Sequence, residues 1–355
     1  MPRERVGVTI GEREASIGEA QVSKPETMLA MSANTYRLQF GDAEVARLRA
    51  SASLGDPMVT DDLGSPAALR RLAEVEVLIT SWGSPPLTAE VLATAPKLRA
   101  VLHAAGSVRP HVRDAVFDRG LLVTTAADAN AEPVARYTLA AVLWAFKKAP
   151  FLAADARRHK DDWSYLSGRG ELSGLHRTVV LVGFSRIGRR VADLLRQFGI
   201  RVLVVDPVVS AADVAATGAE LVGLAEALPV ADVLSLHAPS LPSTRRMIGA
   251  AELAALPPHA TLINTARGAL VDTAALEKAC LAGLHAIIDV TDPEPLPPDS
   301  PLYELPNVML TPHVAGSLGS ETREMTSCAL TELERYAAGL PPVSPVTRSA
   351  LEVQA

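Results

Sequence analysis

Short apolar runs alternate with helix-length amphipathic stretches along most of this 355-residue chain, from residue 35 onward. Strands that alternate with helices are typical of a parallel β-sheet, because parallel neighbours need a long crossover connection. The alternation falls into two series, and the second begins after the irregular stretch 161–176. The sequence therefore predicts an α/β fold, and a chain of this length is expected to divide into two domains.

The apolar runs define the expected strands, and the amphipathic stretches define the expected helices. In the first series we expect strands over 75–82 and 98–105, and helices over 88–95, 112–120 and 131–148. In the second series we expect strands over 178–183, 201–206, 232–238, 260–266, 285–290 and 308–314, and then a helix over 320–339. Residues 1–27 are polar and show no period, so we expect them to be loosely held, with Met28 as a candidate for the true start.

Composition narrows the classes of function. The formal net charge is −6 and no basic block occurs, so no nucleic-acid partner is expected. Cys280 and Cys328 stand alone, which favours a reducing compartment and predicts no metal site. Charged residues interrupt the N-terminus, and the longest apolar stretch, 137–146, is too short to span a bilayer. We therefore expect a soluble, cytoplasmic protein with no membrane partner.

The stretch VLVGFSRIGRRV (180–191) has the spacing of a dinucleotide-binding turn, G-x-G-x-x-G, with Ser185 in place of the middle glycine. Gly183 would make the tight turn, Gly188 would allow close packing of helix on strand, and backbone N–H groups would hold a pyrophosphate. The small serine can itself donate to phosphate. Asp206 ends the next strand as an acceptor for ribose hydroxyls, and no arginine follows closely, so NAD is favoured over NADP. The alternative is that the glycines only form a tight turn between a strand and a helix, and that this turn binds no ligand.

Three later stretches place polar side chains at the ends of predicted strands. Arg267 follows one strand, Asp289 ends the next with Glu294 five residues later, and His313 lies at the end of the last. In an open α/β sheet, the carboxyl ends of the strands border the ligand crevice. An arginine, a glutamate and a histidine can therefore converge beside the nicotinamide. The alternative is that the arginine is a solvated charge and the histidine is structural.

The chain from about residue 98 to 330 resembles the D-2-hydroxyacid dehydrogenase family, which includes phosphoglycerate, D-lactate and glyoxylate/hydroxypyruvate reductases. The motifs that carry the resemblance are VGFSRIGRRVA, LSLHAPSLPSTRRMIG, LINTARGALVDTAAL, DVTDPEPLPPDSPLYELPNVMLTPHVAG and, more loosely, ANAEPVA. Their order and spacing are far more specific than the glycine turn alone. The resemblance implies an oxidoreductase that transfers a hydride between NAD(H) and a small 2-keto or D-2-hydroxy acid.

The resemblance also implies roles for residues. It implies a catalytic set of Arg267, Glu294 and His313, with Asp289 near the nicotinamide side of the cofactor. Together with Asp289, the positions expected to contact the cofactor are Gly183, Ser185, Arg186, Ile187, Gly188, Asp206, His237, Pro239, Thr265 and Ala266. We expect His237 to support the cofactor loop rather than to take part in the reaction.

These residue types suit the implied reaction. Hydride transfer to a 2-keto acid leaves an alkoxide that needs a proton, which a protonated His313 can supply as general acid. Arg267 can bind the substrate carboxylate through two hydrogen bonds and polarise the carbonyl. Glu294 beside the histidine favours the charged form of the ring.

The chain departs from the family at the substrate loop. The family usually shows a glycine-rich loop followed by an acid, as in G-x-D-N, where this chain has HAAGSVRPHV (103–112). Next to Gly106, the backbone N–H groups of Ser107 and Val108 can still hold a carboxylate. Trp82 lies where phosphate-handling relatives place basic residues, so we expect it to line a pocket for glyoxylate, hydroxypyruvate or pyruvate. Because Arg109 is a basic residue in this loop, phosphoglycerate dehydrogenase stays an alternative.

The resemblance implies a discontinuous arrangement of the two domains. A Rossmann-type NAD-binding domain over 127–311, built on a doubly wound parallel sheet, is inserted into a flavodoxin-like substrate domain of residues 1–126 and 312–355. The site lies in the cleft between them, so closure on substrate is expected. Family members are typically homodimers, and the helix with TLAAVLWAF would be either a dimer surface or a buried intrachain helix.

A NAD-sensing binding protein, like the transcriptional corepressors that share this fold, is the alternative from another class of function. The absence of a basic tail argues for the enzyme. Formate dehydrogenases carry glutamine where this chain has Glu294, so we reject that branch. The sequence leaves open the particular substrate, the direction of the reaction in the cell and any regulator.

Overall fold

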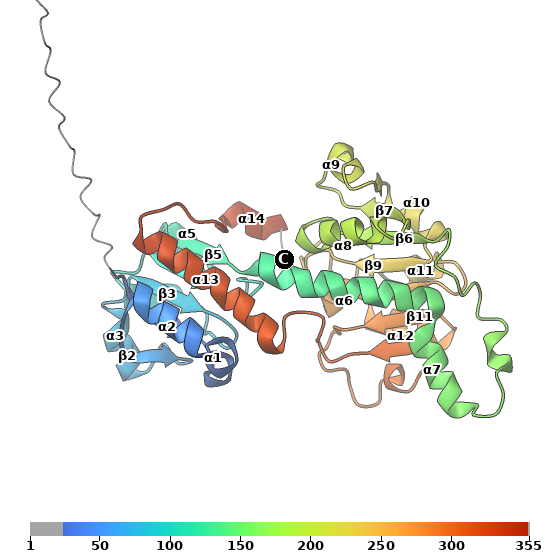
Figure 1. The fold of residues 1–355 in the computed structure, drawn as a ribbon, viewed down its shortest axis with the longest axis horizontal. Coiled ribbons are helices and arrows are strands. Elements are labelled where there is room, and N and C mark those ends of the chain that lie inside the picture. The colour runs from blue at the N-terminus through green and yellow to red at the C-terminus, as the bar shows by residue number, and fades with distance from the viewer. Residues whose placement is uncertain (1–23, 354–355) are drawn as a thin grey trace, which may run out of the picture.

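The computed structural model describes residues 24–353 and places two parallel β-sheets side by side, joined by the long helix α6 (Figure 1). One sheet has five strands and the other has seven. In both sheets every strand pairs with its neighbours in the parallel sense. The predicted α/β fold is therefore confirmed.

The five-stranded sheet has the order β2-β1-β3-β4-β5, which is the flavodoxin-like order. Its strands are β1 (Glu26–Ala30), β2 (Ser53–Thr60), β3 (Val77–Thr80), β4 (Ala100–His103) and β5 (Leu122–Thr125). The helices around it are α1 (Ala33–Gln39), α2 (Asp42–Ser51), α3 (Pro66–Leu72), α4 (Ala89–Ala93), α5 (Asp114–Asp118), α13 (Thr322–Ala337) and α14 (Arg348–Val353).

The seven-stranded sheet has the order β12-β11-β10-β9-β6-β7-β8. Its strands are β6 (Thr178–Val182), β7 (Arg201–Val205), β8 (Glu220–Leu221), β9 (Val233–Leu236), β10 (Thr261–Asn264), β11 (His285–Ile288) and β12 (Val308–Leu310). Its helices are α6 (Ala127–Lys147), α7 (Ala149–Arg158), α8 (Arg186–Arg196), α9 (Ala211–Ala215), α10 (Leu224–Ala227), α11 (Ala250–Ala254) and α12 (Thr273–Leu281). The strand order reverses between β6 and β9, and such a switch point is where doubly wound sheets bind their ligands.

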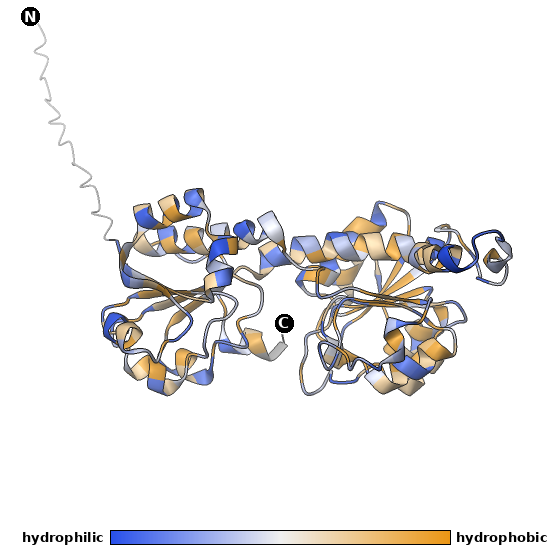
Figure 2. Cartoon of the chain, turned by 90° about the horizontal axis from the view of Figure 1, so that it is seen from below, coloured by the Kyte–Doolittle hydropathy of each residue, from blue (hydrophilic) through white to orange (hydrophobic). Residues whose placement is uncertain are grey.

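The apolar strands are buried between layers of helices in both halves, and Figure 2 shows the hydrophobic colour of the strands and the mixed colour of the helices around them. Helix α13 follows β12 of the second sheet in sequence, yet its Leu330 and Leu333 pack on Ile79 and Leu102 of the first sheet. The chain therefore returns to the five-stranded unit, as a discontinuous substrate domain requires. The domain boundaries at 126/127 and 311/312 stay a prediction.

Helix α6 has 21 residues and begins four residues before the predicted start. Its Val142, Ala145 and Phe146 pack against the seven-stranded sheet, so a buried intrachain helix accounts for most of its apolar stretch. Trp144 is 49% exposed, and that side chain faces away from the core. Among the described residues no helix is long and apolar enough to cross a bilayer.

The prediction for the N-terminal segment is wrong in part. Strand β1 begins at Glu26, and Thr27, Met28 and Leu29 are fully buried, so residues 26–27 are held in the sheet and Met28 lies inside a strand. Residues 1–23 lie outside the described residues. Strands β2, β5 and β8 were not predicted either. The run of β2, SLGDPMVT, contains glycine, aspartate and proline, β5 has only the four residues LVTT, and β8 has only two residues.

Candidate active site

The turn after β6 needs two of its residues to be glycine. Gly183 has a φ of +98°, and a Cβ added there would lie 2.5 Å from the backbone nitrogen of Ala238. A Cβ at Gly188 would lie 2.2 Å from the carbonyl oxygen of Gly183. Ser185 has a φ of −87°, which any L-residue adopts, and it makes no side-chain capping bond at the start of α8. The serine is therefore compatible with the turn, and its hydroxyl is not used by the helix cap.

Asp206 lies directly after β7 and is fixed beside this turn. One carboxylate oxygen accepts from the N–H of Phe184 at 2.7 Å, and the other accepts from the N–H of Val208 at 2.9 Å. Each oxygen keeps a further lone pair. The arrangement fits a dinucleotide whose ribose hydroxyls donate to Asp206 while its pyrophosphate lies at the start of α8.

One cavity brings together most of the residues that the sequence singled out. Gly106 and Ser107 come from the loop after β4, so the five-stranded unit contributes to a wall that is otherwise built by the seven-stranded unit and the start of α6. The predicted site residues on this wall are Gly106, Ser107, Ser185, Arg186, Ile187, His237, Thr265, Ala266, Arg267, Asp289 and His313. The cavity therefore lies between the two units, beside the switch point.

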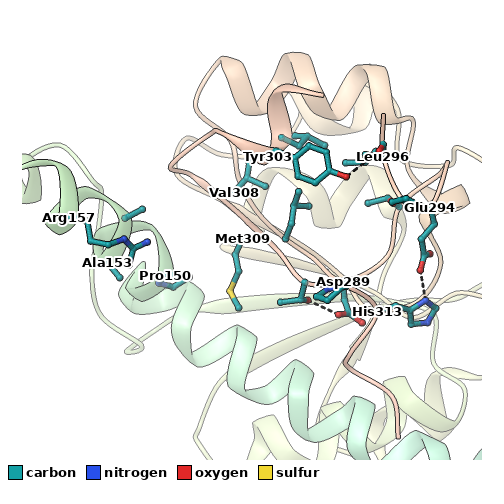
Figure 3. Close-up of a pocket in the computed structure, with 17 residues that line it drawn as sticks. Pro150, Ala153, Arg157, Asp289, Glu294, Leu296, Tyr303, Val308, Met309 and His313 are labelled. Carbon is teal, nitrogen blue, oxygen red and sulfur yellow. Dashed lines mark hydrogen bonds and ion pairs between the residues drawn. The ribbon is translucent and has the colours of Figure 1, made fainter. Parts of the chain in front are cut away.

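His313 and Glu294 form a close pair at this cavity. The Nδ1 of His313 lies 2.6 Å from Oε1 of Glu294, and both side chains are about half exposed (Figure 3). Glu294 comes from the loop after β11, and His313 follows β12 with a φ of +54°. Because Glu294 engages Nδ1, Nε2 is the ring nitrogen left for a substrate oxygen.

Asp289 holds the loop that carries His313. Its buried carboxylate accepts from the Thr311 hydroxyl at 2.6 Å and from the N–H groups of Val314 and Ala315 at 2.8 and 2.9 Å. The hydroxyl of Tyr137, on α6, lies 2.8 Å from the same Thr311 hydroxyl. Burial raises the pKa of Tyr137, the hydrogen bond that joins it to Thr311 opposes the rise, and the charge of Asp289 adds to it. Asp289 therefore has a positioning task in addition to its place on the cavity wall.

Arg267 follows β10 and stands at the mouth of the cavity. Its Nη1 donates to the carbonyl oxygen of Ala266 at 2.6 Å. The surrounding protein lowers the pKa of Arg267 by desolvation, and the charge of Glu294 opposes this effect. Arginine stays charged in proteins despite such a lowering of its pKa, so the planar guanidinium of Arg267 can bind a carboxylate.

His237 is buried at the edge of the cavity, with Nε2 2.9 Å from the hydroxyl of Ser235. Burial lowers the pKa of His237 to about 3, so the ring is neutral. Its Nδ1 has no partner among residues 24–353. A neutral buried ring suits the predicted supporting role at the cofactor loop and does not suit proton transfer.

Seven predicted residues do not line this cavity. Four of them, described above, are Gly183, Gly188, Asp206 and Glu294. The other three are Val108, Trp82 and Pro239. Val108 is 3% exposed, and its side chain belongs to the hydrophobic core of the five-stranded unit. Trp82 follows β3, is 38% exposed and accepts from the N–H of Ser32 at 3.1 Å through its carbonyl. Pro239 follows β9, and its carbonyl accepts from the Thr244 hydroxyl at 2.6 Å. These positions stay predictions for contact with substrate or cofactor.

Sequence reasoning missed Asn130 and Tyr137, both on α6. The Oδ1 of Asn130 accepts from the N–H of Ser317 at 3.0 Å, and its Nδ2 would lie 3.2 Å from a Cβ at Gly106. Asn130 thus joins the loop after His313 to the substrate loop. Its place in the motif ANAEPVA was the available signal, and the spacing alone gives no role to an amide.

Comparison with known proteins agrees with this geometry. Residues 139–315 match the family described as D-isomer specific 2-hydroxyacid dehydrogenase, NAD binding domain. The chain is 32% identical to a glyoxylate reductase of Korarchaeum cryptofilum over 81% of this chain and 87% of that protein. It is 38% identical to a D-3-phosphoglycerate dehydrogenase of Mycobacterium tuberculosis over 79% of this chain, and it spans only about half (53%) of that relative. A solved structure of a phosphoglycerate oxidoreductase from Rhizobium etli superposes with a TM-score of 0.77 at 25% identity, covering 92% of this chain and 100% of that one.

The chain belongs to the D-isomer specific 2-hydroxyacid dehydrogenase family. The part with the glycine turn and Asp206 is the NAD binding domain of that family, so the predicted cofactor is confirmed as NAD. The family resemblance expected from the motifs is confirmed as well.

Proposed function

We propose that this chain is an NAD-dependent dehydrogenase that interconverts a small 2-keto acid and the corresponding D-2-hydroxy acid. The observation that carries the proposal is the 2.6 Å contact between His313 and Glu294, in which His313 shares a cavity wall with Arg267, the glycine turn and the substrate loop. An acid–base group, a carboxylate anchor and a dinucleotide turn are the three parts that this reaction needs.

Each residue of the site has its own role in the proposed reaction. When bound, NADH would supply the hydride. Arg267 would bind the substrate carboxylate and polarise the neighbouring carbonyl, helped by backbone N–H groups of the Gly106–Ser107 loop. Nε2 of His313 would deliver a proton to the carbonyl oxygen, while Glu294 at Nδ1 would stabilise the charged ring and fix its orientation.

Within this class we propose glyoxylate, hydroxypyruvate or pyruvate as substrate. Trp82, in the loop after β3, offers apolar area and a single N–H donor, which suits an uncharged substituent better than a phosphate dianion. The relative named glyoxylate reductase supports this choice. Phosphohydroxypyruvate is the second candidate, because the relative at 38% identity is named D-3-phosphoglycerate dehydrogenase.

A substrate panel tests the proposal. Oxidation of NADH is followed at fixed enzyme concentration with glyoxylate, hydroxypyruvate, pyruvate and phosphohydroxypyruvate, and kcat/KM is compared. We expect one of the three keto acids without a phosphate group to give the highest value and Arg267→Met to lower every value. Phosphohydroxypyruvate as the best substrate would refute the substrate choice, and no turnover with any keto acid would favour a NAD-sensing role.

We also propose that two copies of the chain associate through the seven-stranded unit. A groove of about 940 Å³ runs along the edge strand β12 (Figure 3). Glu294 and His313 of the candidate active site line one part of it, and the part that a second copy would cover lies between Pro150 and Ala153 on α7 and the side chains of Tyr303 and Met309. An apolar groove beside a sheet edge is typical of a surface that a partner covers. Light scattering should give twice the 37.4 kDa of one chain, and Met309→Glu should shift the protein toward one chain. A monomer at micromolar concentration would contradict the proposal.

A further inference from the structure

A second cavity lies at the opposite end of the seven-stranded sheet from the candidate active site. The active-site residues follow the carboxyl ends of β10, β11 and β12, whereas this cavity is formed where the same strands begin. Its volume is about 570 Å³. The stretch 165–169, in the loop that projects after α7 in Figure 1, contributes one side of the wall. The other side comes from His259, Leu281, His285 and Asn307.

His285, the first residue of β11, is the unusual group in this wall. Its side chain belongs to a residue that is 3% exposed, and neither ring nitrogen has a hydrogen-bond partner within the described part of the chain. The ring of Phe151 lies 4.7 Å away, centroid to centroid, and packs against it. Buried polar atoms in native proteins are nearly always paired, so the two nitrogens of His285 are available to a molecule that enters the cavity.

Positive charge surrounds this histidine. The ammonium group of Lys148 donates hydrogen bonds to the carbonyl oxygen of His259 at 2.5 Å and to the hydroxyl of Thr261 at 2.9 Å. Arg169 forms an ion pair with the buried Asp155 and donates through Nε to the Tyr165 carbonyl at 3.1 Å. Burial, with the charges of Lys148, Arg169 and His259, lowers the pKa of His285 to about 3, so the ring is neutral. A neutral imidazole has one N–H to donate, and the cations around it favour an acceptor that carries negative charge.

We propose that this cavity is a second ligand site, separate from the dehydrogenase site, for a small organic anion that carries a carboxylate. The carboxylate accepts a hydrogen bond from the ring of His285 and lies in the field of Arg169 and Lys148. Because Arg169 belongs to the loop after α7 and His285 belongs to the sheet, the bound anion ties that loop to the body of the molecule.

Calorimetric titration with malonate, a small dicarboxylate, tests the site. The protein carries Arg267→Met throughout, so that the carboxylate anchor of the active site does not contribute. We expect saturable binding that His285→Phe removes, because phenylalanine keeps a ring against Phe151 and loses both nitrogens. His176→Phe, at an exposed histidine outside the cavity, is the matched control and should bind as the parent does. Absence of saturable binding in the parent would mean that the cavity holds water only, and it would overturn the proposal.

If His285→Phe disturbs the fold, two charge variants at the entrance of the cavity still test the proposal. Leu281 lines the cavity and is 62% exposed, so a charged residue is tolerated there. Leu281→Lys should tighten malonate binding, and Leu281→Glu should weaken it, each by roughly threefold at low ionic strength. Equal affinities in the two variants would place the anion elsewhere and overturn the proposal.

Protection from trypsin provides a second readout. Cleavage after Arg157, Arg158 or Lys160, at the end of α7 and just beyond it, should slow when malonate is added, because the anion holds the adjoining loop. Cleavage that malonate leaves unchanged would contradict the tie between loop and sheet. Neither measurement depends on turnover, so failure of the dehydrogenase proposal leaves this test intact.

Discussion

At the scale of single residues, the candidate catalytic pair depends on one unusual backbone angle. His313 has a φ of +54°, a region that non-glycine residues seldom adopt, and it is held there by hydrogen bonds to Asp289. The backbone N–H of His313 donates to the Asp289 carbonyl at 2.9 Å, and the Asp289 carboxylate accepts from the two residues that follow. The angle directs the ring toward Glu294, which lies 19 residues earlier in sequence.

Replacement of Glu294 by glutamine should lower the turnover of keto-acid reduction. Oε1 of Glu294 lies 2.6 Å from Nδ1 of His313, so the carboxylate fixes the orientation of the ring that is to deliver the proton. Glutamine keeps the size of the side chain and loses its charge, so kcat should fall while NADH affinity stays nearly unchanged. Steady-state kinetics of Glu294→Gln and wild type provide the measurement. His313→Ala should lower kcat by roughly 10²- to 10⁴-fold, and an unchanged kcat in Glu294→Gln would show that the pair does not act together.

Two substitutions in the glycine turn should have opposite outcomes for cofactor binding. Gly188→Ala puts a Cβ 2.2 Å from the Gly183 carbonyl oxygen, so the turn must open and NADH affinity should fall at least tenfold. Ser185→Gly removes a hydroxyl from a position with an ordinary φ, and the affinity should change by no more than about threefold. Titration of NADH fluorescence compares the two variants. A large loss in Ser185→Gly would instead assign the serine hydroxyl a main role in holding phosphate.

At the level of helices and strands, α6 supports the site through side chains that contact three of its segments. Asn130 joins two loops at its first turns, Tyr137 reaches the Thr311 hydroxyl, and the hydroxyl of Thr138 lies 3.1 Å from that of Thr265 on the cavity wall. One rigid helix therefore supports the substrate loop, the end of β10 and the loop that carries His313. A helix holds such contacts in fixed register because residues 7 to 8 positions apart lie on one face.

Tyr137→Phe should reduce turnover without harming the fold. The substitution removes a hydroxyl that helps to orient Thr311 and, through it, the Asp289 carboxylate. We expect kcat to fall roughly 2- to 10-fold, the equivalent of one hydrogen bond, with unchanged NADH affinity and thermal midpoint. Tyr36→Phe, in a tyrosine stacked on Phe40 in the five-stranded unit, is the control. Equal kcat in Tyr137→Phe and wild type would remove Tyr137 from the positioning network.

The junction of α6 and α7 should make stability depend on pH. Burial and the charge of Arg177 lower the pKa of Lys148 to about 8, with Asp232 acting in the opposite direction. The unfolded value is about 10.4, so the ammonium opposes folding below about pH 8, and stability rises with pH between these two values. Relative to Lys148→Met, wild type should gain about 1–2 kcal/mol in unfolding free energy between pH 7 and 9.5. Urea unfolding measures this, and Lys147→Met, at an exposed neighbour, should show no such change.

At the scale of the whole molecule, the candidate site is shared between two units. Gly106 and Ser107 belong to the five-stranded unit, whereas Arg267 and Asp289 belong to the seven-stranded unit. His313 lies just beyond the predicted boundary at 311/312, and its contacts with Asp289 and Glu294 hold it against the seven-stranded unit. The units are connected by α6 and by the stretch between β12 and α13. A site divided in this way can exclude water only when its two walls approach each other.

Binding of NADH together with oxamate, a keto-acid analogue that is not reduced, should therefore make the molecule more compact. The carboxylate of oxamate links Arg267 to the loop at Ser107, which draws the two units together. Small-angle X-ray scattering should show a smaller radius of gyration with both ligands than with NADH alone. Arg267→Met lacks the anchor and should show no such change. An equal contraction in that variant would mean that the cofactor alone closes the cleft.

Six of the seven strands of the larger sheet and most side chains of the site could be predicted from the sequence. The central strands are buried on both faces, so they appear as continuous apolar runs, and the side chains after them fall at one edge of the sheet. Gly183, Asp206, Arg267 and His313 could be selected for this reason. Strand β2 could not, because its run contains turn-forming residues, and β5 and β8 are too short to show a pattern. Strand β1 lies where no alternation was recognised.

The way in which these residues are held depends on contacts between elements that are distant in sequence. The contact between His313 and Glu294, the hydrogen bonds from the Asp289 carboxylate and the reach of Tyr137 to Thr311 all join different elements. Local sequence specifies the period of burial along one element, whereas such contacts depend on how far neighbouring elements approach each other. The cavity around His285 belongs to the same category, since its wall is assembled from a loop and three strand starts that are distant in the chain.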